Sequence, residues 1–194
     1  FLTGLSGNAD AYFTKALDIT NRISGMDSPQ SADIYEWLGV YHNGFSDSVS
    51  ARKFLWRAMR IRAANNQLDE FSSGNLYRYM GLFYKRFGKL DSALLCLRKA
   101  KSLFDDRYGS SNYESIKCLN NVADVFETMG YPDSAMNIYT KCLDLIYNNS
   151  CVSRYVLTMT YFNIAELYGN SGEYLNALNY MQKALALYFS EFDK

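Results

Sequence analysis

The 194-residue chain is long enough for one globular domain or a short repeat array, and a hydrophobic content of 48% argues against disorder. Its 20 basic and 20 acidic side chains cancel, so the chain lacks the net positive field that draws proteins to nucleic acid or to an anionic membrane surface. It contains no run of roughly 20 apolar residues, so we expect no direct membrane insertion of this segment.

Breaker residues divide the chain into a leading helix and four helical hairpins. With only two prolines, the composition favours helix almost throughout. A segment from Gly25 to Ser31 that contains Pro29 separates the leading helix, residues 1–24, from the rest. Beyond it, apolar residues recur at the 3.6-residue spacing of helices with one buried face. The hairpins are predicted at residues 31–65, 70–106, 112–148 and 152–190 of a single domain that covers residues 1–194.

Glycines mark the bend of each later hairpin. Gly88, Gly130 and Gly172 follow one another at intervals of 42 residues. Pro132 comes early in the helix after Gly130, where a missing amide hydrogen does no harm. The first hairpin has Ser46 at the corresponding place instead of glycine. Such short connections force the two helices of a hairpin to lie antiparallel.

Small residues recur at the same 42-residue interval. Gly81 has equivalents in Gly39, Ala123 and Ala165, and we expect the two helices of a hairpin to cross closely there. Small residues of the second helix should face this crossing and admit the next repeat. The first set is Ala51, Ala93, Ala135 and Ala177, and the second is Ala58, Ala100, Cys142 and Ala184. A fixed interval of this kind predicts a repeat array.

The full pattern resembles the tetratricopeptide repeat, whose positions follow the order W-L-G-Y-A-F-A. In the second hairpin they hold Tyr77, Met80, Gly81, Tyr84, Ala93, Leu97 and Ala100, and in the fourth Tyr161, Ile164, Ala165, Tyr168, Ala177, Met181 and Ala184. Common repeats have about 34 residues. An interval of 42 is similar to the longer-helix variety of kinesin light chains and of many bacterial sensor proteins. The resemblance implies an all-α fold, a right-handed α-solenoid (superhelix) of antiparallel helical hairpins.

The resemblance also implies a concave surface, lined by the first helix of each hairpin, that holds an extended peptide or a partner helix. Asparagine side chains can donate to and accept from a peptide backbone, while charged neighbours select side chains. The residues placed there by the repeat alignment are Asn75, Arg78, Tyr79, Leu82, Lys85, Lys117, Asn120, Asn121, Asp124, Phe162, Asn163 and Glu166.

Charges on this expected surface are arranged in blocks. The middle is basic, with acidic residues on either side, so a ligand with acidic residues in its centre would fit. The basic residues are Arg78, Lys85, Arg86 and Lys117, and the acidic ones are Asp33, Glu36, Asp124, Glu127 and Glu166. The alternative is a solvated surface with ordinary intrachain ion pairs. A second basic cluster on an outer helix, which we expect to be solvated, comprises Arg52, Lys53, Arg57, Arg60 and Arg62.

Motifs for catalysis, metal or cofactor binding are missing from the sequence. His42 is the single histidine and occupies an aromatic core position of the repeat, so we expect a structural role. The four cysteines have neither a CxxC pair nor zinc-ligand spacing. No phosphate-binding glycine loop and no HExxH segment is present. We therefore expect no catalytic residues, no metal and no cofactor.

The predicted function is a non-enzymatic protein–protein interaction scaffold with a peptide-binding groove. The alternative is a ligand-sensing or dimerisation segment of a larger signalling protein, such as a sensor kinase or a transcription regulator. Because the chain begins with Phe1, we expect a piece of a longer protein, and the terminal helices should expose apolar surface for self-association. Cysteine usage favours the cytoplasm slightly, with a periplasmic sensor segment left open.

Overall fold

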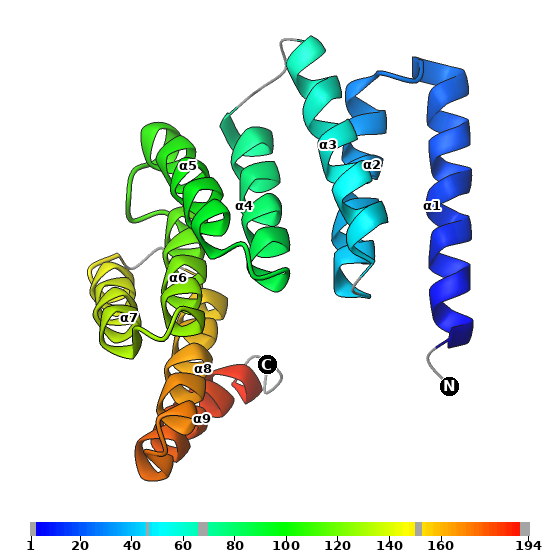
Figure 1. Cartoon of the computed structure of the whole chain (residues 1–194). Coiled ribbons are helices and arrows are strands. Elements are labelled where there is room, and N and C mark those ends of the chain that lie inside the picture. Colours follow the sequence, from blue (N-terminus) through cyan, green and yellow to red (C-terminus); the bar gives the residue numbers. More distant parts are fainter. Residues whose placement is uncertain (1–2, 46, 66–69, 150–152, 191–194) are drawn as a thin grey trace.

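The computed structural model describes residues 3–45, 47–65, 70–149 and 153–190, and these residues form nine helices and no strand. Figure 1 shows the helices following one another from α1 at one end of the molecule to α9 at the other. Their bounds are α1 Thr3–Ser24, α2 Pro29–Gly44, α3 Ser48–Ala64, α4 Glu70–Arg86, α5 Leu90–Tyr108, α6 Tyr113–Thr128, α7 Pro132–Tyr147, α8 Arg154–Asn170 and α9 Tyr174–Phe189.

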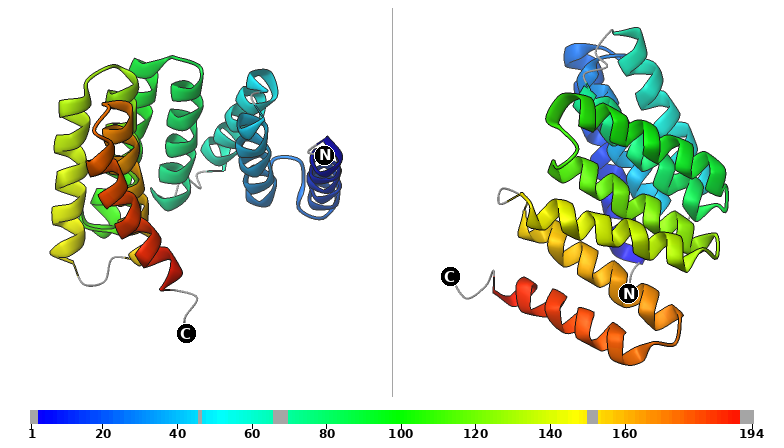
Figure 2. Two further views of the ribbon diagram at one scale, coloured as in Figure 1. Left: turned by 90° about the horizontal axis from the view of Figure 1, so that it is seen from below. Right: turned by 90° about the vertical axis from the view of Figure 1, so that its left-hand side faces the viewer.

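After α1, the helices pair into four hairpins: α2 with α3, α4 with α5, α6 with α7, and α8 with α9. Each hairpin packs on the next, which confirms the predicted all-α solenoid (Figure 2). The hairpin ends lie within two residues of the predicted ones, and two of the differences are outward extensions by two residues. Helix α2 begins at Pro29, inside the expected breaker, because proline is well suited to the first turn of a helix. Helix α5 continues to Tyr108, past the predicted end at residue 106.

Short polar side chains begin several helices. The Ser28 hydroxyl accepts a hydrogen bond from the backbone N–H of Ser31 at 3.2 Å, and Asp47 accepts one from Ser50 at 3.1 Å. Asn112 caps α6 by accepting from two backbone N–H groups at 2.9 and 3.0 Å. These bonds satisfy amide hydrogens that have no partner within the helix.

The glycine bends are confirmed. Gly88, Gly130 and Gly172 have φ angles of 71°, 83° and 80°, in the left-handed region that favours glycine. The residue after each glycine donates its backbone N–H to a carbonyl five residues back, at 2.9 Å in all three hairpins. Ser46, which replaces glycine in the first hairpin, lies outside the described residues.

The close helix crossings are also confirmed. A Cβ atom added to Gly39 would lie 2.6 Å from Cγ of Leu55, and one added to Gly81 would lie 2.6 Å from Cγ of Leu97. The small residues of the second helices are fully buried at most of their positions. Those with 0% exposure are Ala51, Ala58, Ala93, Ala100, Ala135 and Cys142. Backbones at these crossings therefore approach too closely for larger side chains.

The core consists of clusters that each join two or more hairpins. One contains Leu55 of α3 together with Leu76 and Met80 of α4, and another joins Tyr139 of α7 to Ile164 of α8. Stability is thus distributed along the array rather than concentrated in one centre. Three cysteines, Cys96, Cys118 and Cys142, are buried free thiols, and burial raises the pKa of Cys118 and of Cys142 to about 12. Cys151 lies outside the described residues.

Candidate functional site

The first helices of the hairpins form one continuous face of the solenoid. Helix α2 contacts α4, α4 contacts α6, and α6 contacts α8, whereas no comparable contact joins α3, α5, α7 and α9 to one another in the described part of the chain. Closer spacing of the first helices places them on the inside of the curve. We call the exposed side of α2, α4, α6 and α8 the inner face.

The predicted site residues all lie on α4, α6 and α8. Asn75, Arg78, Tyr79, Leu82 and Lys85 come from α4, Lys117, Asn120, Asn121 and Asp124 from α6, and Phe162, Asn163 and Glu166 from α8. Their accessibility differs widely. Phe162 is 44% exposed, whereas Arg78 is 8% and Asn120 only 1% exposed. The alignment thus places all of these residues on first helices of the hairpins, but it does not separate surface from buried positions.

Two of the basic side chains are paired within the chain. Lys85 of α4 forms an ion pair with Asp124 of α6. Lys117 lies 3.1 Å from a carboxylate oxygen of Glu114, and its Nζ is 4.6 Å from the ring centre of Tyr113. The positive centre of the inner face is therefore smaller than the sequence suggests, as the alternative of intrachain pairing requires.

Arg78 is different, because among the described residues no carboxylate lies within ion-pair distance of it, and the charge of Glu36 acts on it only at longer range. Its Nη2 donates to the Asn75 side-chain oxygen at 3.1 Å, and its guanidinium lies 4.5 Å from the ring centre of Tyr79. Its buried Nε has no hydrogen-bond partner in the described structure. Arg78 is consequently a nearly buried cation whose hydrogen-bonding capacity is only partly used.

The acidic residues of α2 are held by a neighbouring helix. Arg62 of α3 donates to Asp33 and to Glu36, both at 2.8 Å. Burial raises the pKa of Glu36, and the Arg62 charge opposes that shift. The prediction of a solvated Arg62 was wrong, because the last turn of α3 packs against α2 and buries this side chain.

Asn120 links two helices and is not available at the surface. Its Nδ2 donates to the Ile116 carbonyl and to the Thr160 hydroxyl, both at 3.1 Å, and its Oδ1 accepts from Asn163 at 3.4 Å. Asn121 is only half-buried. Adjacent helical residues point about 100° apart, so the two asparagines do not face the same way.

A hollow of about 430 Å³ opens where α4, α6 and α8 meet. Its lining is Lys85, Asp124, Glu127, Thr128, Tyr139, Asn163, Glu166 and Asn170. Asn170 donates to Glu127 at 2.7 Å. Partial burial raises the pKa of Glu166, the nearby carboxylates of Glu127 and Asp124 add to the shift, and Lys85 opposes it. The hollow can thus accept several hydrogen-bond donors from a partner.

Tyr139 and Thr128 line this hollow although neither was among the predicted site residues. Tyr139 occupies a core position of the second helix, and its ring is almost wholly buried. Burial raises its pKa, with the carboxylates of Asp124 and Glu127 adding to the effect. Tyr139 is equivalent in the repeat to the fully buried Leu97, and only the three-dimensional arrangement shows that it also lines the hollow.

His42 occupies the aromatic cluster expected for it. Its Nε2 lies 3.3 Å from Asp10 of α1, and its Nδ1 lies 3.2 Å from Asp47. Its ring centre is 5.3 Å from those of Tyr41 and of Phe54. His42 thereby ties α1 to the first hairpin. Across the described ranges, no three His, Cys, Asp or Glu side chains gather as a metal site, and no helix has the length and apolar character to span a membrane.

Comparison with known proteins confirms the family resemblance. Residues 116–149 and 160–190 match the family model of the tetratricopeptide repeat. No curated protein matches the chain. Among solved structures, the chain is similar to BtubC (BKLC) from P. vanneervenii, with 17% identity and a TM-score of 0.75 over 98% of this chain and 76% of that one.

Two further structures extend the comparison. A putative kinesin light chain of Podosopora anserina with nearly identical TPR-like repeats is 13% identical, with a TM-score of 0.69 over 97% of this chain and 89% of that one. A crystal structure of MamA is 17% identical, with a TM-score of 0.56 over 100% of this chain and 99% of that one. At these identities the comparisons establish the fold alone.

Proposed function

We propose that this tetratricopeptide-type solenoid is a protein-interaction scaffold that holds a peptide or partner helix against the inner face. Solenoids of this kind generally act as non-enzymatic interaction scaffolds, and the repeat match and the related structures support that general role. The specific proposal concerns where the partner lies and which residues contact it. Arg78 is the single observation that carries it.

Arg78 is better suited to binding an anion than to stabilising the chain alone. A buried charge is costly unless it is paired, yet this guanidinium has an amide oxygen and an aromatic ring as partners and keeps an unused Nε–H. Guanidinium groups bind carboxylates through two parallel hydrogen bonds. A carboxylate of the bound segment would bind the small part of the guanidinium that remains exposed, in agreement with the acidic-centred ligand expected from the sequence.

Neighbouring side chains provide the remaining contacts. Asn121 and Asn163 are half-buried, and their amides could hold the backbone of an extended segment. Phe162 exposes 44% of its surface and offers an apolar contact beside the polar hollow. A partner spanning α4 to α8 would therefore meet a cation, amides and an aromatic ring in succession.

The test begins with partners captured from a lysate by the immobilised chain and identified, after which the affinity of one purified partner is measured. Arg78→Gln should weaken binding at least tenfold, because the partner carboxylate loses its guanidinium. Phe162→Ala should also weaken it, and its exposed position makes unfolding an improbable cause. Arg60→Glu, at an exposed position of α3, serves as the control and should stay within twofold.

Thermal unfolding followed by circular dichroism establishes that each variant is folded. If Arg78→Gln and Phe162→Ala both bind the partner as tightly as the unchanged chain, the inner face is not the binding surface. If Arg78→Gln and Phe162→Ala lose only as much affinity as the control Arg60→Glu, the effect is nonspecific, and the inner face is again excluded as the binding surface.

A second candidate function, dimerisation within a larger signalling protein, is favoured by the surface of α9. Apolar side chains project from this helix, including Leu175, which is 85% exposed, and Leu178 and Phe189. Sedimentation equilibrium should then show self-association at high micromolar concentration. The double variant Leu175→Lys/Leu178→Lys should lose this self-association. The control Tyr131→Lys, at the residue just before α7, should retain it. A strict monomer at that concentration would rule this function out.

A further inference from the structure

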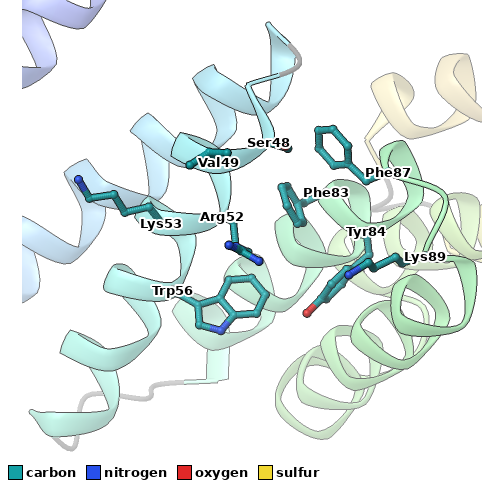
Figure 3. Close-up of a pocket in the computed structure, with 9 residues that line it drawn as sticks. All are labelled: Ser48, Val49, Arg52, Lys53, Trp56, Phe83, Tyr84, Phe87 and Lys89. Atoms are coloured by element: carbon teal, nitrogen blue, oxygen red, sulfur yellow. The ribbon is translucent and has the colours of Figure 1, made fainter.

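A second hollow, of about 600 Å³, lies between the first and second hairpins (Figure 3). It is lined by the N-terminal half of α3, the C-terminal end of α4 and the connection between α4 and α5. The lining residues are Ser48, Val49, Arg52, Lys53, Trp56, Phe83, Tyr84, Phe87 and Lys89. We propose that this hollow binds an acidic peptide segment of a partner protein that carries an apolar side chain.

Aromatic rings form the floor and walls. Phe83 is buried, with its ring centre 4.9 Å from that of Phe87. Trp56 lies edge-on to Tyr84 at 5.9 Å and to Phe83 at 6.5 Å. Such edge-to-face contacts fix the rings in place, so an entering apolar side chain would meet a preformed wall and lose little free energy to rearrangement.

Two cations border the aromatic wall. Figure 3 shows Arg52 pointing between Trp56 and Tyr84, and Lys89 lying beside Tyr84. Burial raises the pKa of Tyr84, the Cys96 thiol adds to the shift, and the Arg52 charge opposes it. Lys53 points away from the hollow and lies 5.8 Å from the ring centre of Phe54.

No carboxylate balances these cations. The lining contains no Asp or Glu, and in the described residues neither Arg52 nor Lys89 takes part in an ion pair. The charge complement of this surface is therefore acidic. Because the cations sit beside aromatic rings, the ligand must combine negative charge with apolar surface, as a peptide with acidic residues around an apolar one does.

This hollow is distinct from the inner face. Phe83 and Tyr84 of α4 point to one side, whereas Arg78, Leu82 and Lys85 point to the other, since Lys85 lies roughly 200° around the helix from Phe83. The proposal thus adds a second partner surface to the solenoid and does not rest on the function proposed above. The volume of the hollow, about 600 Å³, also lies within the range of about 300–1,000 Å³ that is typical of ligand sites.

The test uses a fluorescein-labelled synthetic peptide with a central phenylalanine flanked by aspartates and glutamates, titrated with the full chain and followed by fluorescence anisotropy. Arg52→Glu/Lys89→Glu should weaken binding at least tenfold. The matched control Arg98→Glu/Lys99→Glu makes the same charge change at exposed positions of α5 and should stay within twofold. Circular dichroism confirms that both double variants remain folded.

Tryptophan emission then locates the bound peptide. The chain has two tryptophans, so Trp37→Phe leaves Trp56 as the sole reporter, and an unlabelled copy of the acidic peptide should change its emission. A peptide with lysines in place of the acidic residues should leave that emission unchanged.

Several outcomes would overturn the proposal. These are the absence of binding at millimolar peptide, an equal loss in the two double variants, and tighter binding of a single-stranded oligothymidylate than of the peptide. Loss of peptide binding in Arg78→Gln alone would place the acidic peptide on the inner face and would equally refute this second site. A failure here leaves the function of the inner face untouched, because that function is tested with other variants and another partner.

Discussion

At the scale of single residues, glycine decides how closely two helices of a hairpin can approach. The two atoms closest to a Cβ added at Gly81 belong to Leu97, which is itself fully buried and cannot move aside. Gly39 has the same relation to Leu55. The contact explains why these two positions hold glycine.

Gly81→Ala should therefore lower the free energy of unfolding by about 1–3 kcal/mol, the cost of overpacking a rigid core. The matched control is Gly169→Ala in α8, where an added Cβ meets nothing within 4 Å. That substitution should stabilise the chain by up to about 1 kcal/mol, because alanine favours helix more than glycine does. Urea unfolding of both variants measures the difference, and equal effects would refute the close-crossing explanation.

Glu166 gives stability a pH dependence that can be tested in the same way. Its pKa is raised in the folded chain, so its favourable contribution is present at low pH and is lost as the pH rises through that folded pKa. At pH 7 the ionised carboxylate opposes folding. Glu166→Gln should raise the melting temperature at pH 7 and change it little at pH 4. Glu173→Gln, at an exposed position outside the hollow, controls for removal of a negative charge.

At the scale of helices and hairpins, the interval of 42 residues was enough to predict the bends and the buried small residues. Gly88, Gly130 and Gly172 all have the expected backbone conformation. Ion pairing was not predictable in this way. Arg62 resembles its exposed neighbours in sequence, and only the packing of α3 on α2 shows that it holds Asp33 and Glu36.

For the candidate site, too, the repeat pattern predicted which helices carry the residues but not which side chains are accessible. Repeat alignment found α4, α6 and α8, because the same helix of each hairpin lines the inner face. It could not tell that Asn120 is buried while Asn121 is half-buried, or that Tyr139 of α7 reaches the hollow. Those facts depend on contacts between hairpins, which have no signature within a single repeat.

Asn120 provides a test of those contacts between hairpins. Asn120→Ala should cost about 1–3 kcal/mol of stability, since Thr160 of α8 loses a buried hydrogen-bond donor. The loss of stability in the double variant Asn120→Ala/Thr160→Val should differ from the sum of the losses in the two single variants by a coupling free energy of about 0.5–3 kcal/mol. The control Asn121→Ala should change stability by less than about 0.5 kcal/mol. Additive effects in this double-mutant cycle would show that the bond does not join the hairpins energetically.

At the scale of the whole molecule, the arrangement of the helices separates two kinds of surface. The first helices contact one another and bring Arg78 and Lys85 of the second hairpin and Glu166 of the fourth onto a single inner face. The second hollow instead opens at the junction of α3, α4 and α5. A short solenoid can thus offer separate surfaces to separate partners, with its stability distributed along the array.

Hydrogen–deuterium exchange of the chain, measured alone and with the partner captured for the inner face, tests the central claim most directly. A partner on the inner face should add protection to peptides from α4, α6 and α8, with the largest change around Arg78 and the hollow at Lys85 and Glu166. Protection confined to α5, α7 and α9, with no change on α4, α6 and α8, would contradict it.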